Sequence, residues 1–174
     1  NINLLGEFNV ANLLAAFAAL LSQGIELSQL VMAAEKLKPV IGRMESFGGS
    51  DSVTAVVDYA HTPDALEQAL KALRPHCDGQ LWCVFGCGGD RDKGKRPMMG
   101  GIAESLADKV VVTDDNPRSE DSELIAQDIL NGCNRPDNIA VILDRRSAIK
   151  HSLSNADSND VVLIAGKGHE NYQI

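Results

Sequence analysis

The chain has 174 residues, a length that fits one domain, or one domain with part of another. Its 24 acidic and 16 basic side chains give a formal charge of −8, which argues against general nucleic-acid binding because that function needs a basic face. Hydrophobic residues make up 44%, enough for a packed core, but no apolar run approaches a membrane span and no signal-peptide pattern is visible, so we expect no membrane association.

Residues 1–41 are expected to be mainly helical. Apolar side chains at three- and four-residue spacing predict a first helix. They are Phe8, Leu13, Leu14, Phe17, Leu20 and Leu21. Gly24 is a plausible C-terminal cap, Ser28 is predicted to open a second helix, and Pro39 closes the section. Because helices with so wide an apolar face normally pack against a larger body, we interpret residues 1–41 as the end of a neighbouring domain.

From about residue 42 onward, apolar strands alternate with amphipathic helices. The expected strands are 53–58, 80–85, 109–113, 139–143 and 160–165. The expected helices begin at Thr62-Pro63 and span about 97–107, 122–131 and 145–155. This alternation predicts an α/β fold with a Rossmann-like, mostly parallel sheet and helices on both of its faces.

The cysteines indicate reduced, partly buried thiols. They are Cys77, Cys83, Cys87 and Cys133. Three residues separate Cys83 from Cys87, whereas zinc sites use a two-residue spacing, so we expect no metal site. A cytoplasmic protein fits this usage of cysteine.

Four of the predicted strands end in polar or glycine-rich loops. In an open parallel sheet such loops converge on one crevice, where ligands bind. The loops are 58–61, 86–96, 114–118 and 166–170. Together they carry both acidic and basic side chains, so the sequence predicts one site better suited to a zwitterion than to a plain anion.

The loop from Gly89 to Lys95 has the glycine and lysine spacing of a phosphate-binding loop. Arg96 follows, however, where a Ser or Thr should hold a magnesium ion. A nucleotide loop is therefore disfavoured against two alternatives, a solvated charged loop and a loop whose guanidinium and ammonium groups grip an oxyanion. We favour the oxyanion-gripping loop because those groups suit carboxylates and phosphates.

The other polar positions permit two interpretations each. Asp58 can bind ribose hydroxyls or a metal and His61 can contact a phosphate, or else Asp58 and Thr62 only cap the following helix. Asn9 and Asn12, one helical turn apart, either face a ligand together or face solvent. The loop 166–170, Gly-Lys-Gly-His-Glu, is a weak signal by itself.

The segment Asp115-Asn116-Pro117-Arg118 is the most specific of these signals. Pro117 restrains the loop, so Asn116 and Arg118 can project together. Arg118 offers a bidentate fork for a carboxylate, and Asp115 can accept hydrogen bonds from an ammonium group. The alternative is an ordinary helix-opening turn, because Ser119, Asp121 and Ser122 follow.

Taken together, six segments in this order closely resemble the Mur ligases of peptidoglycan synthesis. They are 6–12 (GEFNVAN), 42–45 (GRME), 58–64 (DYAHTPD), 88–97 (GGDRDKGKRP), 115–118 (DNPR) and 166–170 (GKGHE). The resemblance implies that residues 1–41 are the helical end of a central ATPase domain. It further implies that residues 42–174 are most of a C-terminal, amino-acid-binding domain.

The resemblance also implies a reaction and a set of contacts. The family uses ATP and Mg²⁺ to phosphorylate the carboxylate of a UDP-linked muramoyl peptide, and an incoming amine then attacks the acyl phosphate. The arginine of the 115–118 motif implies meso-2,6-diaminopimelate as the amino acid and UDP-MurNAc-dipeptide as its acceptor, in the bacterial cytoplasm. The diaminopimelate contacts would be Arg91, Asp115, Asn116, Pro117, Arg118, Gly166 and Glu170. The nucleotide contacts would be Asn9, Asn12, Arg43, Asp58 and His61.

The true ATP loop and the metal ligands of the family are absent from these residues, so we expect no catalytic residue here and no ligase activity from this chain alone. Its partners would include the remaining domains of the same polypeptide. Two other functions are considered. One is a folylpolyglutamate- or cyanophycin-synthetase-like ligase domain, which can share the 58–61 segment. The other is a stand-alone module that binds a zwitterion without chemistry.

Overall fold

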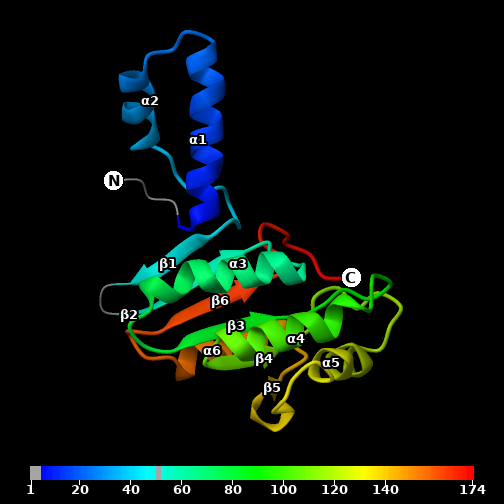
Figure 1. The fold of residues 1–174 in the computed structure, drawn as a ribbon. Coiled ribbons are helices and arrows are strands. Elements are labelled where there is room, and N and C mark those ends of the chain that lie inside the picture. The colour runs from blue at the N-terminus through cyan, green and yellow to red at the C-terminus, as the bar shows by residue number, and fades with distance from the viewer. Residues whose placement is uncertain (1–4, 50–51) are drawn as a thin grey trace.

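Six strands form one sheet in the order β1-β2-β6-β3-β4-β5, in a computed structural model that describes residues 5–49 and 52–174 (Figure 1). The strands are β1 (Glu45–Gly49), β2 (Ser52–Asp58), β3 (Leu81–Phe85), β4 (Lys109–Val112), β5 (Ala140–Val141) and β6 (Val161–Ala165). Only β1 runs antiparallel to its neighbour, and the other four pairings are parallel. The predicted α/β fold with a mostly parallel sheet is confirmed.

Helices cover both faces of this sheet. One apolar cluster joins the sheet to α3 (Pro63–Leu73), α4 (Lys95–Leu106) and α5 (Ser122–Leu130). A second cluster, around Trp82, Val84 and Ile164, joins the opposite face to α6 (Arg145–Asn155). β3 and β6 are buried along their whole length because helices lie above and below them. Short 3₁₀ turns at Arg74–His76 and Pro136–Asn138 complete the secondary structure.

Two strands differ from the expectation. β1 lies in a stretch that the sequence does not mark as a strand, because Glu45–Gly49 is mostly exposed and ends in two glycines. It forms a hairpin with β2 at one edge of the sheet. β5 covers two residues instead of the five in 139–143, although the backbone of Ile142 still donates to Val112 O at 2.9 Å.

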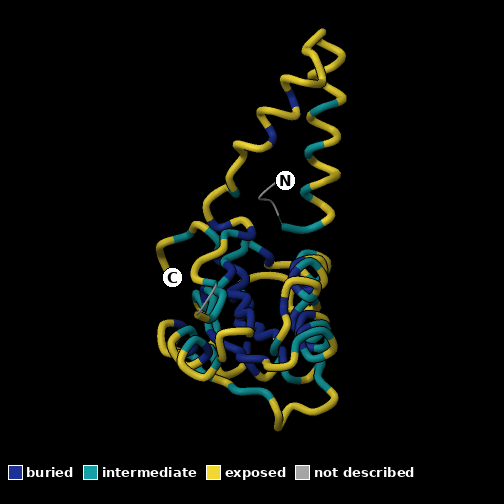
Figure 2. Tube along the Cα trace, turned by 90° about the vertical axis from the view of Figure 1, so that its left-hand side faces the viewer, coloured by how far each residue is buried: buried dark blue, intermediate teal, exposed yellow. Residues whose placement is uncertain are grey.

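α1 (Glu7–Ser22) and α2 (Leu27–Ala34) stand apart from the sheet as a helical pair (Figures 1 and 2). α1 buries none of its residues, and its apolar side chains Val10, Leu14 and Leu21 remain exposed. Gly24, at φ +83°, ends α1 by donating to Leu21 O, as predicted. α2 begins at Leu27, one residue before the predicted Ser28. No helix within residues 5–49 and 52–174 is long and apolar enough to cross a membrane.

Candidate functional site

The loops that follow β2, β3, β4 and β6 enclose one cavity of about 370 Å³ at the carboxyl edge of the sheet. This volume lies in the range of small-molecule sites. The cavity, called the loop cavity below, is lined by Tyr59, His61, Gly86, Gly88, Arg91, Lys95, Asp115, Asn116, Arg118, Gly166, Glu170 and Tyr172. The convergence of four loops on one crevice, predicted from the sequence, is confirmed.

The two arginine-bearing loops are locked to each other at Gly89. Gly89 N donates to Asn116 O at 2.9 Å, and a Cβ built on Gly89 would lie only 1.9 Å from Pro117 O. Only glycine fits at that approach. Arg118 adopts φ +54° and donates from Nη1 to Gly89 O at 2.8 Å and to Asn116 O at 3.2 Å. Its guanidinium is thereby held at the wall of the loop cavity.

A buried arginine, Arg96, stabilises both loops. Arg96 is 0% exposed and donates to both carboxylate oxygens of Glu120, at 2.9 and 3.0 Å. It also donates to Asp128 at 2.9 Å and to Gly88 O at 3.2 Å. Glu120 in turn accepts from the Asp90 backbone N–H at 2.6 Å. This cluster, the Arg96 clamp, ties the loop after β3 to α5 and to the turn before it.

The Arg96 clamp alters the interpretation of the charged 89–96 loop. Arg96 points into the protein, and Lys93 pairs with Glu120 at 2.8 Å, so neither lines the loop cavity. Arg91 and Lys95 do line it. Lys95 Nζ also donates to His61 O at 2.8 Å. Of the four cations in that loop, two therefore reach the cavity and two hold the loop in place.

Acid is expected to loosen the Arg96 clamp. Hydrogen bonds from Arg96, Lys93 and the Asp90 backbone lower the pKa of Glu120 from 4.5 to about 2. Because this folded-state pKa is depressed, its stabilisation is complete above the unfolded value of 4.5 and is lost as the pH falls toward about 2. Urea unfolding between about pH 5 and pH 3 should therefore depend less steeply on pH in Glu120→Gln than in the unaltered chain. The exposed Glu123→Gln is the control. Equal slopes for Glu120→Gln and the unaltered chain would contradict the role assigned to this carboxylate.

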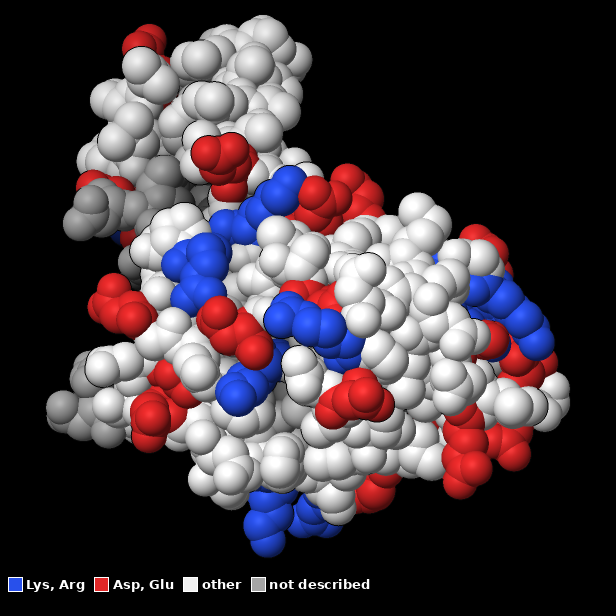
Figure 3. Space-filling model, turned by 60° about the horizontal axis from the view of Figure 1, so that its bottom comes forward, with Lys and Arg blue, Asp and Glu red and all other residues white. Residues whose placement is uncertain are grey.

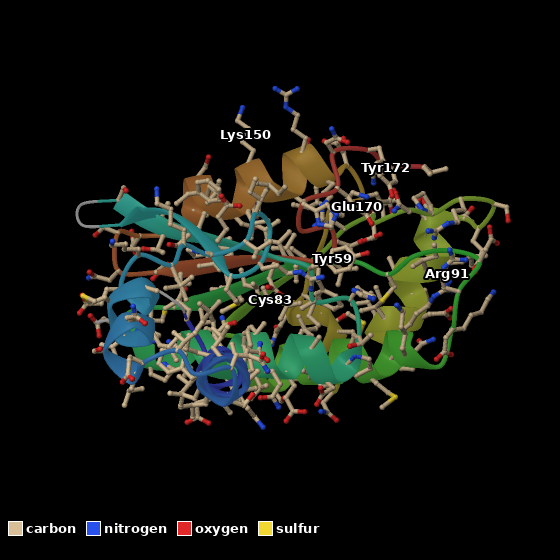
Figure 4. All side chains as sticks on the ribbon, turned by 90° about the horizontal axis from the view of Figure 1, so that it is seen from above. Tyr59, Cys83, Arg91, Lys150, Glu170 and Tyr172 are labelled. Atoms are coloured by element: carbon tan, nitrogen blue, oxygen red, sulfur yellow. The ribbon has the colours of Figure 1, made fainter. Side chains whose placement is uncertain are left out.

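Glu170 is the acidic centre of the loop cavity. It accepts from Tyr59 Oη at 3.3 Å, Asn116 Nδ2 at 3.4 Å and Lys167 Nζ at 3.3 Å. Burial acts to raise the pKa of Glu170, but the hydrogen bond and charge of Lys167, with the bonds from Tyr59 and Asn116, lower it below its ordinary value. The carboxylate is therefore charged at neutral pH and faces the cavity (Figure 4).

Lys167 and Gly166 set the geometry around Glu170. Lys167 is buried and also donates to Asn116 Oδ1 at 3.0 Å, so it orients two cavity residues at once. Gly166 has φ +112°, a conformation that side-chain-bearing residues rarely adopt. A Cβ there would lie 2.7 Å from Asp115 Oδ2. The glycine thus leaves room for the Asp115 carboxylate beside the turn.

The loop cavity combines charges of both signs. Arg91, Lys95 and Arg118 contribute cations, while Asp115 and Glu170 contribute carboxylates. This mixture continues on the surface, where basic side chains lie in small groups among acidic ones on the face shown in Figure 3. Such an arrangement can hold a ligand that carries both carboxylate and ammonium groups.

The predicted nucleotide contacts divide between two places. Asn9, Asn12, Arg43 and Asp58 line a second cavity of about 630 Å³ between α1, α3 and residues 37–44, called the α1 cavity below. His61 instead lines the loop cavity. Its Nδ1 lies 2.7 Å from Tyr59 O.

Asp58, the last residue of β2, is hydrogen-bonded to the segment that connects α2 to β1. Its Oδ2 accepts from Met44 N at 2.9 Å, and its Oδ1 accepts from Ala60 N at 2.8 Å. Thr62 performs the helix capping that the sequence offered as one interpretation, because its hydroxyl accepts from Ala65 N at 3.3 Å. Asp58 is therefore not part of the α3 cap and contributes to the wall of the α1 cavity.

Several site residues escape sequence reasoning. Tyr59, Tyr172 and the buried Lys167 all contact the site, although no pattern in the sequence predicts a contact for them. Lys95 lines the cavity as well, within the loop that the sequence predicts to grip an oxyanion. Lys167 lies within the 166–170 motif, and its position between two glycines was the feature of the sequence that could have identified it as a site residue. Tyr59 adjoins the strand-end Asp58, but no residue pattern shows which cavity its ring faces. The four cysteines are free thiols, and three of them are buried, as predicted.

Known proteins with the same pattern were found by comparison of sequence and of structure. The Mur ligase, glutamate ligase domain, matches residues 42–168. Two UDP-N-acetylmuramoyl-L-alanyl-D-glutamate–2,6-diaminopimelate ligases, from Vibrio parahaemolyticus and Vibrio vulnificus, are 61% and 60% identical over 171 residues. These alignments cover 98% of this chain but only 35% of each relative, so the chain spans about a third of their length.

Solved structures agree in fold. The structure of a UDP-N-acetylmuramoyl-L-alanyl-D-glutamate–2,6-diaminopimelate ligase matches with a TM-score of 0.75 at 50% identity, covering 99% of this chain and 36% of that one. A folylpolyglutamate synthase of Mycobacterium tuberculosis in complex with ADP reaches the same TM-score of 0.75 at 23% identity, covering 95% of this chain and 38% of that one. At that identity, the second likeness concerns the fold alone.

Proposed function

Since this chain belongs to the Mur ligase family, we propose that it supplies the amino-acid site of an ATP-dependent ligase that adds meso-2,6-diaminopimelate to UDP-N-acetylmuramoyl-L-alanyl-D-glutamate. The observation that carries this proposal is the loop cavity, where Arg91 and Arg118 stand with Asp115 and Glu170. The two Vibrio relatives bear the name of that activity. Residues 1–41 would be the end of the central domain, and 42–174 most of the C-terminal one.

The task of this chain in such a reaction is to orient an amine. In the family reaction ATP phosphorylates the carboxylate of the acceptor peptide, the amine nitrogen attacks the acyl carbon, and the bond to phosphate breaks. The attacking nitrogen must lose its proton and point at that carbon. Asp115 and Glu170 are placed to hold ammonium groups, so the contribution we assign to them is proximity and orientation.

The arginines supply the selectivity in this proposal. Diaminopimelate carries two carboxylates and two ammonium groups, whereas lysine lacks the distal carboxylate. Within the described part of the chain the Arg118 guanidinium donates from Nη1, so Nη2 and Nε are the atoms we expect to meet a carboxylate. Arg91, labelled in Figure 4, comes from the adjacent loop after β3, and its Nη1 donates to Asp90 O at 3.0 Å. A charge-assisted hydrogen bond contributes about 1.5–3 kcal/mol, enough to favour diaminopimelate about tenfold or more.

ATP would be a substrate whose nearest contacts in this chain lie in the α1 cavity. Asn9 and Asn12 offer amide groups for a base, while Arg43 offers a cation for phosphate. The ligands for Mg²⁺ are considered separately from those for ATP. Among residues 5–49 and 52–174, no group of three His, Cys, Asp or Glu side chains could hold a metal ion. We assign these residues no step through the metal.

Calorimetric titration of this chain with meso-diaminopimelate, L-lysine and ATP separates the candidate functions. We expect diaminopimelate to bind at least about tenfold more tightly than lysine, because only it satisfies both arginines. Equal binding of the two amino acids would overturn the selectivity. ATP binding with no amino-acid binding would favour the folylpolyglutamate-like alternative. Amino-acid binding without ATP binding would favour a stand-alone zwitterion module.

A further inference from the structure

Tyr59 lies between the two cavities and contacts a residue of each. Arg43, which lines the α1 cavity, has its guanidinium carbon 4.5 Å from the centroid of the Tyr59 ring. Glu170, in the loop cavity, accepts a hydrogen bond from the Tyr59 hydroxyl at 3.3 Å. Figure 4 shows Tyr59 and Glu170 at the same end of the sheet, near the loops that follow the strands. One half-buried side chain thus spans both predicted binding regions.

The position of this ring is fixed by its surroundings. The His61 ring packs edge-on at 4.7 Å, and the His169 ring lies 5.5 Å away on a tilted plane. A Cβ on Gly168 would lie 2.8 Å from Tyr59 Cβ, so only glycine permits this approach. Burial and the nearby Glu170 charge raise the pKa of Tyr59, so its hydroxyl remains a protonated donor at neutral pH.

We propose that Tyr59 is a positioning residue shared by the two sites, holding Arg43 for the nucleotide with its ring face and Glu170 for the amino acid with its hydroxyl. This inference rests on the proposed function, because it takes the loop cavity as the diaminopimelate site and the α1 cavity as the nucleotide site. The two contacts use different parts of the side chain. They can therefore be removed one at a time.

Tyr59→Phe removes the hydroxyl and keeps the ring. We expect it to weaken meso-diaminopimelate binding about threefold to tenfold and to leave ATP binding unchanged. The effect is smaller than that of a lost direct contact because Asn116 and Lys167 still hold Glu170. Tyr59→Leu removes the ring as well. We expect it to weaken ATP binding about twofold to fivefold in addition, because the cation–π contact is lost. Diaminopimelate binding is measured by calorimetry on the whole 174-residue chain. The ATP effect is measured as the Michaelis constant of the whole ligase, because the true ATP loop of the family is absent from these residues.

Matched variants separate positioning from general damage. Phe47→Leu removes an exposed aromatic ring from the neighbouring β1 and should change neither constant. If Tyr59→Leu does not fold, Tyr59→Met is a second variant that removes the ring and leaves Arg43 in place, and it should weaken ATP binding to the same extent. Tyr59→Phe with unchanged diaminopimelate binding, or with both ligands weakened equally, would overturn the proposal. If the unaltered chain binds no diaminopimelate, the proposed function fails and this inference fails with it.

Discussion

Replacing Arg118 by alanine is expected to weaken meso-diaminopimelate binding by about tenfold to a hundredfold while sparing ATP. The guanidinium is the group in the 115–118 loop that can form two parallel bonds to a carboxylate. The α1 cavity, where we place the nucleotide contacts, does not include Arg118. Calorimetric titration with each ligand measures both effects, and in the whole ligase the same change should raise the Michaelis constant for diaminopimelate.

The variant Arg118→Lys distinguishes charge from geometry. Lysine keeps the positive charge but loses the planar fork, so we expect its affinity to lie between those of the unaltered and alanine forms. Arg118 also donates to Gly89 O and Asn116 O, so thermal unfolding should be measured beside binding. L-lysine offers an internal control, because its weaker binding should change less than that of diaminopimelate. Equal affinity of unaltered and alanine forms for diaminopimelate would refute the assignment.

Replacing Arg96 by alanine is expected to lower the free energy of unfolding by about 3 kcal/mol, the low end for breaking a buried ion pair. The loss is large because Glu120 and Asp128 both lose the fully buried cation that they share, and Glu120 then keeps its pair with the exposed Lys93. It stays at the low end because Glu120 and Asp128 keep some access to solvent, with side chains 16% and 39% exposed. Urea unfolding monitored by circular dichroism measures the change.

Two further variants test whether the lower free energy of unfolding of Arg96→Ala comes from its buried ion pairs. Lys71→Ala removes an exposed pair with Glu67 within α3, and it should change the free energy of unfolding by no more than about 0.5 kcal/mol. Arg96→Ala combined with Glu120→Gln should be less unstable than the sum of the two single changes, because the unpaired charge is removed with its partner. A fully additive result, or an Arg96→Ala protein as stable as the original, would count against the Arg96 clamp.

Much of the site could be predicted because a parallel sheet leaves few options for where the loops after its strands can lie. Strands such as Val161–Ala165 are continuously apolar, so both faces had to be buried and their carboxyl ends had to share an edge. From that alone, Asp115, Arg118 and Glu170 could be placed in one crevice although 54 residues lie between the first and the last. The roles assigned to them remain predictions.

The sequence could not reveal what depends on side-chain direction. Arg96 adjoins Lys95 in the chain, yet one is fully buried and the other lines the cavity, since the first turn of α4 points them different ways. His61 is three residues from Asp58, but they line different cavities because the chain turns sharply before α3. β1 carries no apolar alternation, so its pairing comes from the neighbouring β2.

The close approach of Gly89 to Pro117 limits how the amino-acid selectivity of the loop cavity can change. Because Gly89 fits against Pro117 with no space for even a methyl group, the loops bearing Arg91 and Arg118 cannot shift independently. A change of amino-acid selectivity should therefore need matched changes in both loops. Redesign of the amino-acid selectivity of the loop cavity should therefore exchange residues 86–96 and 113–120 together, as one unit.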